Sequence, residues 1–233
     1  MERLDKLLAG TGRWSRKEVK ELIRAGRVTV DGKTAARPEE KCPPDAALAV
    51  DGESISCGGF LYLMLHKPAG FVSATEDPRE KTVLELLPEH LRRVGLFPAG
   101  RLDKDTEGLL LLTNDGVLAH ELLAPKKHVD KTYFVRVDGA LDQEDVNAFA
   151  AGMTLGDGTI CRSAGLELLE RPDEALVTLR EGKYHQIKRM LAARGKPVLY
   201  LKRLTMGPLT LDETLEKGQW RELTEQERGA LGR

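Results

Sequence analysis

Four consecutive leucines, Leu109–Leu112, stand between two polar segments and constrain the fold more than any other feature of the sequence. A strand that is apolar on both faces must be covered on both sides, so this run predicts the buried centre of a sheet. The polar loop before it, residues 100–108, is therefore fixed to a rigid element and can hold a side chain in a set place. Most acidic loops only cap turns or face solvent, and without further information Asp103 would be interpreted that way.

Two short helices and a hairpin are predicted at the start of the chain. Apolar residues at helical spacing favour a first helix over residues 2–9. A second helix begins at Ser15, where residues 15–18 form a capping-box sequence, and ends at Gly26, a residue suited to the left-handed position after a helix. Residues 27–30 then read as a strand that ends in the turn dipeptide Asp31-Gly32.

The second helix is expected to bury one face and expose a cationic one. Val19, Leu22 and Ile23 form the apolar stripe, and Lys17 and Lys20 fall on roughly the opposite side. A small helical cap with an ordinary charged exterior would explain the stripe. It would not explain why the exterior is so one-sided in charge.

The net charge of −1 hides two basic segments in an acidic background. Residues 1–37 carry 10 Lys/Arg against 5 Asp/Glu, and residues 180–203 carry 8 against 1. Such segments are often only solvated faces, but two concentrated basic surfaces are also typical of a protein that binds RNA. Charge alone does not decide between these interpretations.

Breaker-rich stretches near Pro43-Pro44 and at Cys57-Gly58-Gly59 flank a predicted strand with the sequence LAVDGESI, and they place a domain boundary at about residue 59. We therefore divide the chain into residues 1–58 and 60–233. The second part alternates strands with helices, which predicts an α+β fold around a mixed, largely antiparallel sheet. The expected elements are strands with the sequences LYLMLHK, LLLLT, TYFVRV and ALVTLR and helices near 117–124, 142–151 and 184–194.

The first residues are charged where a signal peptide needs an apolar run, and no segment reaches a membrane-spanning length, so we expect a cytoplasmic protein without a membrane partner.

Cys42, Cys57 and Cys161 are odd in number and form no CxxC pair. This pattern indicates neither a disulfide framework nor a zinc site, and we expect no metal.

The run GRLDKDTEGLLLLTNDG, residues 100–116, resembles the catalytic motif of the RsuA/RluB group of pseudouridine synthases almost residue for residue. KTY at 131–133 and EGKYHQIKRM at 181–190 follow in the order of that family. The two helices and the VTVDGK hairpin resemble the S4 RNA-binding domain, so the resemblance covers almost the whole chain. HQIKRM and the approach PKKHVDKTY are more similar to the enzymes that act on small-subunit (16S) ribosomal RNA than to the large-subunit branch.

The resemblance implies an isomerase that converts a uridine to pseudouridine without a cofactor or metal. Asp103 matches the catalytic carboxylate, whose role as nucleophile or as electrostatic partner of a cationic sugar stays open. Tyr133 matches the tyrosine that stacks on the uracil, and Lys188 the cation that keeps the carboxylate charged. Without the motif, Tyr133 would be read as core and Lys188 as a surface lysine. Arg189 is a weaker substitute, because it points about 100° away on a helix.

A uridine in folded RNA must be turned out of its helix before an enclosed carboxylate can reach it. Arg101 matches the residue that fills the vacated space or grips the displaced backbone, although it could be one more phosphate contact. The S4-like surface is expected to bind RNA phosphates through Arg13, Arg16, Lys17 and Lys20, and Arg189 is a further candidate contact.

We expect the partner to be small-subunit rRNA or a small-subunit assembly intermediate, bound by a monomer. The alternatives are a synthase acting on large-subunit rRNA and a non-catalytic ribosome-assembly factor that keeps the fold for binding alone.

Asp105 and Glu107 could suggest a glycosidase-like carboxylate pair. We interpret Asp105 instead as ordering the loop, and His185 and Gln186 as bonding within the start of their helix and organising the loop that carries Asp103.

Overall fold

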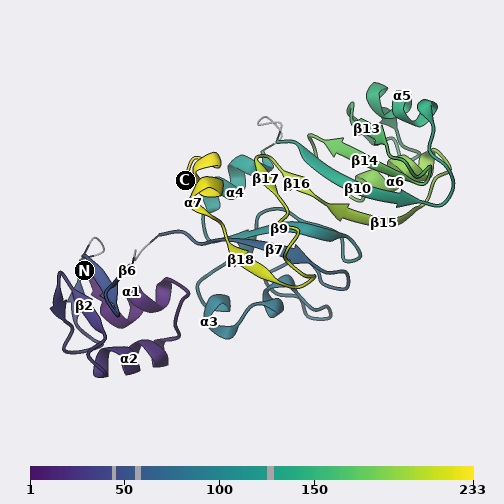
Figure 1. The fold of residues 1–233 in the computed structure, drawn as a ribbon. Coiled ribbons are helices and arrows are strands. Elements are labelled where there is room, and N and C mark those ends of the chain that lie inside the picture. Colours follow the sequence, from purple (N-terminus) through teal and green to yellow (C-terminus); the bar gives the residue numbers. More distant parts are fainter. Residues whose placement is uncertain (44–45, 56–58, 125–128) are drawn as a thin grey trace.

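The computed structural model describes residues 1–43, 46–55, 59–124 and 129–233 and shows a small N-terminal unit followed by a larger sheet unit (Figure 1). Cys57 and residues 125–128, which hold part of the PKKHVDKTY sequence, lie outside the described residues. The N-terminal unit has its own apolar core, built from residues between Leu4 and Ile55. The division at about residue 59 stays a proposal.

The N-terminal unit packs two helices on a small sheet of strand order β3-β2-β5-β6. Its elements are β1 (Glu2–Arg3), α1 (Leu4–Gly10), α2 (Arg16–Arg24), β2 (Val28–Val30), β3 (Lys33–Thr34), β4 (Lys41–Cys42), β5 (Leu48–Val50) and β6 (Glu53–Ile55). The capping box at Ser15 is present, with Glu18 N–H donating to Ser15 Oγ and Ser15 N–H donating to Glu18. Gly26 follows the helix at φ +70°. Both predicted ends of this helix are confirmed.

Two predictions in the N-terminal unit are wrong in detail. The first helix begins at Leu4, because Glu2 and Arg3 pair with β4 and take their backbone hydrogen bonds from that ladder. The LAVDGESI segment is a hairpin rather than one strand, since Asp51 and Gly52 both adopt positive φ angles, 53° and 83°, and reverse the chain.

The C-terminal unit is built on an eight-stranded sheet with the order β13-β14-β10-β15-β9-β7-β18, in which β8 also pairs with β9. All of its ladders are antiparallel except β15 with β9, so the predicted mixed, largely antiparallel sheet is confirmed. Its strands are β7 (Tyr62–Lys67), β8 (Phe97–Pro98), β9 (Glu107–Thr113), β10 (Lys131–Val137), β13 (Gly165–Leu168), β14 (Glu174–Leu179), β15 (Val198–Arg203) and β18 (Trp220–Glu222). β8, β13, β15 and β18 were not predicted.

Helices flank this sheet, and short pairs of strands lie beside it (Figure 1). The helices are η1 (Val83–Leu86), α3 (Glu89–Arg92), α4 (Gly116–Leu123), α5 (Gln143–Ala151), α6 (Gln186–Ala193) and α7 (Glu225–Ala230). The accessory strands are β11 (Met153–Thr154) with β12 (Ile160–Cys161) and β16 (Thr205–Met206) with β17 (Leu209–Thr210). None of the helices in the described part of the chain is long and apolar enough to cross a membrane.

The four leucines of β9 are fully buried and face two different cores. Leu109 and Leu111 pack in the cluster that includes α4, whereas Leu110 and Leu112 pack in the cluster that includes η1 and α3. This alternation is the two-sided burial that the sequence predicts. It fixes the strand that follows the polar loop.

One short parallel ladder joins the two halves of the sheet. β15 meets β9 through the pairs Lys202–Glu107 and Arg203–Gly108. A side chain at residue 108 would not fit, because its Cβ would lie 2.2 Å from the carbonyl oxygen of Arg203 and the backbone has φ +105°. Arg203 Nε also donates to the carbonyl of Leu109 at 2.7 Å, so the junction depends on a glycine.

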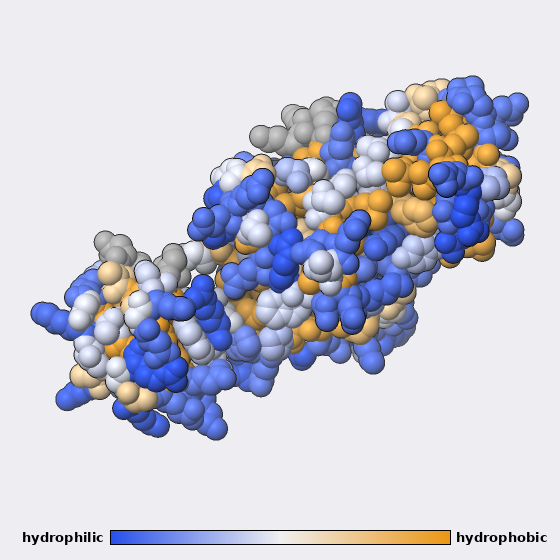
Figure 2. All heavy atoms as spheres, in the orientation of Figure 1, coloured by the Kyte–Doolittle hydropathy of each residue, from blue (hydrophilic) through white to orange (hydrophobic). Residues whose placement is uncertain are grey.

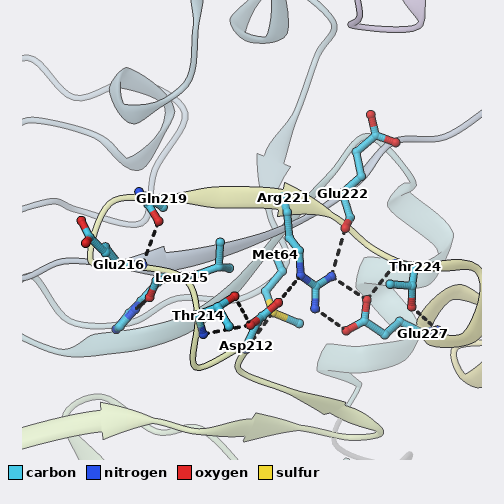
Figure 3. Close-up of polar contacts among 11 residues, drawn as sticks. Met64, Asp212, Thr214, Leu215, Glu216, Gln219, Arg221, Glu222, Thr224 and Glu227 are labelled. Atoms are coloured by element: carbon cyan, nitrogen blue, oxygen red, sulfur yellow. Dashed lines mark hydrogen bonds and ion pairs between the residues drawn. The ribbon is translucent and has the colours of Figure 1, made fainter.

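The far edge of the sheet is closed by a polar network around Arg221 of β18 (Figure 3). Arg221 Nε donates to Asp212 at 2.6 Å, and its Nη atoms donate to Glu227 of α7 at 2.7 and 2.8 Å. Hydrogen bonds from Thr214 and from Arg221 lower the pKa of Asp212 to about 2. The network ties the C-terminal helix to the sheet.

Candidate active site

Asp103 lies in the loop between β8 and β9, and main-chain contacts hold that loop. The N–H of Thr106 donates to the carbonyl of Asp103 at 3.0 Å and closes a turn. Ser73 Oγ bonds both the N–H and the carbonyl of Leu102, each at 3.0 Å. The Asp103 carboxylate takes part in none of these hydrogen bonds within the loop, and the Asp103 side chain is 25% exposed.

Lys67, at the end of β7, holds the loop through hydrogen bonds to main-chain carbonyls. This residue was not predicted from the sequence. Its side chain is completely buried, and the three N–H groups of Nζ are shared among four carbonyl oxygens, those of Pro68, Asp103, Lys104 and Thr106, which lie 2.8–3.3 Å from Nζ. Burial lowers the pKa of this amine to about 8, although the charges of Asp105 and Asp103 oppose the shift. The only sequence signal was a lysine at the end of an apolar strand, where a solvated side chain is the usual expectation.

Lys188 reaches Asp103 from the other half of the sheet unit. It lies in the first turn of α6, and Nζ is 3.0 Å from Asp103 Oδ2 and 2.5 Å from Asp105 Oδ1. Burial disfavours its charge, but the hydrogen bonds with Asp105 and Asp103 outweigh this effect and raise the pKa of Lys188. The predicted pairing of Asp103 with Lys188 is present, and Asp105 belongs to the same ion cluster.

The start of α6 brings a second side-chain nitrogen, from an imidazole ring, to the carboxylate. His185 has a left-handed backbone, φ 47°, and its Nε2 lies 3.5 Å from Asp103 Oδ1. Gln186 accepts from the N–H of Lys183 at 3.0 Å and donates to Glu181 at 2.7 Å. The prediction that Gln186 bonds within the helix start is confirmed. The contact of His185 with Asp103 agrees with the expectation that His185 organises the loop carrying Asp103.

Asp103, Lys188, Tyr133 and Arg101 line one small cavity of about 90 Å³. Tyr133 comes from β10, where it pairs with Arg203 of β15. This cavity shares Arg101, Asp103 and Tyr133 with a larger cleft of about 870 Å³, a size typical of ligand sites. Three segments far apart in the sequence, which contain residues 101–103, 133 and 188, thus converge where a planar ring could lie against a carboxylate.

Other candidates lie outside this cavity. Arg189 turns away and pairs with Asp157 at 2.5 Å. Glu107 accepts from Tyr200 at 2.7 Å and from Lys217 at 3.0 Å, so it braces the sheet junction rather than forming a carboxylate pair with Asp105. Within the described ranges, no group of three or more His, Cys, Asp or Glu side chains is arranged to hold a metal ion.

The S4-like candidates lie on the N-terminal unit. Arg13, Arg16 and Lys17 are exposed and Lys20 is half-buried, while the predicted stripe of α2 is buried. Figure 2 shows predominantly hydrophilic atoms along the edge of this unit where α2 lies. The face opposite the apolar stripe is therefore available to a charged partner.

Two family models match the chain. The model described as RNA pseudouridylate synthase matches residues 61–193, and the S4 domain model matches residues 2–48. The chain belongs to the RNA pseudouridylate synthase family. It is an isomerase of that family with an N-terminal S4 domain.

Several relatives are similar to this synthase over nearly its whole length. It is 50% identical to the uncharacterized RNA pseudouridine synthase YtzG of Bacillus subtilis, over 97% of this chain and 96% of the relative. It is 40% identical to ribosomal small subunit pseudouridine synthase A of Escherichia coli, over 97% of both chains. A solved pseudouridylate synthase is 34% identical, with a TM-score of 0.70, over 99% of this chain and 100% of the other. The likeness therefore includes both the S4 domain and the catalytic domain.

Proposed function

We propose that the synthase isomerises one uridine of small-subunit ribosomal RNA, with Asp103 as the catalytic carboxylate. The observation that carries this proposal is the contact of 3.0 Å between Asp103 and Lys188 in a cavity also lined by Tyr133 and Arg101. An ionised carboxylate is needed where the sugar gains cationic character, and a neighbouring ammonium favours the ionised form.

The reaction breaks the N1–C1′ bond, rotates the uracil and joins C5 to C1′. The hydrogen on C5 leaves as a proton and N1 gains one, so there is no net redox change. Asp103 attacks as a nucleophile or stabilises the cationic sugar, while Tyr133 stacks on the uracil and holds it for rotation. Lys188 places its ammonium group 3.0 Å from Oδ2 of Asp103. None of these steps requires a cofactor.

The target uridine must leave its helix, which costs a few kcal/mol. Arg101 is exposed at the mouth of the cavity. Its guanidinium can fill the space that the uridine vacates or bind the displaced phosphates. We assign Arg101 to RNA binding rather than to the chemical step.

The two domains divide the work in this proposal. Residues 1–58 dock on the RNA through Arg13, Arg16, Lys17 and Lys20, and residues 60–233 carry out the isomerisation. The relatives named as small-subunit synthases favour small-subunit rRNA, free or in an assembling particle, as the substrate. We propose a monomer that acts in the cytoplasm.

The decisive test is incubation of the purified synthase with small-subunit rRNA, large-subunit rRNA and assembly intermediates, followed by position-resolved detection of pseudouridine. One new pseudouridine in small-subunit rRNA is the expected result. A mark confined to large-subunit rRNA would replace the small-subunit proposal with the large-subunit alternative. RNA binding with no turnover on any substrate would favour a non-catalytic assembly factor.

A further inference from the structure

An aromatic pair stands at the rim of the large cleft and takes no part in the mechanism above. Tyr184 is 74% exposed, and its ring stacks on that of His185 with centroids 3.8 Å apart and planes 18° from parallel. One face of the Tyr184 ring is therefore covered by a neighbour. A stacked ring with a free face is a ready surface for another flat ring.

The pair is held in a set position relative to Asp103. His185 lies between the two, 3.5 Å from Asp103 Oδ1 through Nε2 and in ring contact with Tyr184. The backbone there is fixed by Gln186, which bonds Lys183 and Glu181. Only one imidazole ring separates the carboxylate from the exposed tyrosine, so the two positions are close enough for adjacent nucleotides.

The cleft that Tyr184 lines is cationic. Six Lys/Arg residues and three Asp/Glu residues contribute to its wall, which gives a net charge of +3 with histidine neutral; the cations are Arg101, Lys131, Arg162, Arg180, Lys183 and Arg203. Arg162 and Arg180 have side chains that are 64% and 66% exposed. An aromatic platform beside a basic groove is the combination with which proteins bind single-stranded nucleic acid.

We propose that Tyr184, backed by His185, stacks an unpaired base next to the uridine that occupies the Asp103 cavity. This assignment rests on the proposed function and adds a second base site to it. The platform holds the flanking nucleotide while the target is turned out, which increases RNA affinity without contributing to the chemical step.

The test measures binding separately from turnover. A single-stranded oligouridylate carrying one 2-aminopurine at successive positions is titrated into the wild type and into Tyr184→Ala and Tyr184→Phe variants. Loss of one stacked base corresponds to roughly 5- to 150-fold weaker binding. We expect Tyr184→Ala to fall in that range and to lose quenching of the 2-aminopurine at one position, and Tyr184→Phe to bind within about twofold of the wild type because only the ring is needed.

Phe60→Ala is the matched control, because Phe60 is another exposed aromatic, 54% exposed, that does not line the cleft. Equal affinity and equal quenching for wild type and Tyr184→Ala would overturn the proposal. So would a Tyr184→Phe variant as weak as Tyr184→Ala, or unchanged dependence on Tyr184 when the quenched position is made abasic. A protein partner as the true occupant of the platform would give these same negative results.

Turnover on rRNA separates failure of this inference from failure of the proposed function. With the platform in place, Tyr184→Ala raises KM by the same factor as the oligonucleotide Kd and leaves kcat within about threefold. If rRNA is isomerised but Tyr184→Ala changes neither KM nor Kd, only the platform fails. If no rRNA is isomerised by the wild type, the proposed function fails whatever the oligonucleotide titrations show.

Discussion

Replacing Asp103 by Asn is the sharpest test of the candidate site, because it removes one negative charge and almost no volume. The loop itself should survive, since Lys67 and Thr106 hold it through the main-chain carbonyl of residue 103. Lys188 keeps Asp105 as a partner at 2.5 Å. For a partly exposed ion pair the expected loss in the free energy of unfolding is about 1 kcal/mol or less.

The loss in rate should be far larger. A carboxylate about 3.5 Å from a developing unit positive charge contributes about 5 kcal/mol at an effective dielectric constant of ~20. This is a factor of roughly 3000 in rate. Covalent attack by Asp103 would make the loss greater, so about 10³-fold is the lower bound for the Asp103→Asn variant.

Release of tritium from C5 of the uridine counts turnovers directly, because that hydrogen leaves when C5 joins C1′. Asp105→Asn is the matched control: Asp105 has a side chain that is 73% exposed and bonds the same Lys188 nitrogen. We expect this control to stay within about tenfold of the wild-type rate, since Asp105 does not line the small cavity. An Asp103→Asn rate within tenfold of wild type, with RNA affinity unchanged, would refute the assignment.

Three further changes test the support of the site and its RNA contacts. Lys67→Met leaves four carbonyls without their donor, so we expect the free energy of unfolding in urea to fall by about 2–4 kcal/mol and turnover to fall with it; wild-type activity in this variant would show that the loop does not need the amine. Lys17→Ala combined with Lys20→Ala should weaken RNA binding and flatten its dependence on salt by about 1.4–1.8 in log–log slope if each lysine neutralises one phosphate; an unchanged slope would place the RNA elsewhere. The pKa of Asp212 is lowered from 3.8 to about 2 in the folded state, so its contribution to stability is present above pH 4 and is lost as the pH falls toward 2. Urea unfolding between pH 5 and pH 3 should therefore show a smaller acid-induced loss in Asp212→Asn than in the wild type, and equal losses would contradict the role of its hydrogen bonds.

Elements with a strong local signal could be predicted from the sequence. The capping box at Ser15, the Asp31-Gly32 turn and the buried run Leu109–Leu112 each depend on interactions within a few residues or on burial itself, and all three are present. β15 was not predicted, because its partners in the sheet lie far away in the sequence. Its register against β9 depends on Gly108, which no local pattern identifies as a point of close approach.

The candidate site likewise contains residues that could be predicted from the sequence and residues that could not. The motif resemblance named Asp103, Tyr133 and Lys188, and the structure brings these three to one cavity. Lys67 was missed as a neighbour of the Asp103 loop because its role arises from contacts across 36 positions of the chain. His185 was expected to organise that loop, and its contact with Asp103 spans 82 positions. A fully buried lysine with only carbonyl partners has no signature in composition or periodicity.

The two-residue ladder between β15 and β9 has a consequence for how the enzyme would lose activity. Asp103 belongs to the lobe of β9, and Lys188 belongs to the lobe of β10, β14 and α6, so these two candidate site residues lie on opposite sides of the short ladder. Each lobe has a separate apolar core. Mild heat or low denaturant could let the lobes drift apart while each stays folded, and inactivation would then precede melting.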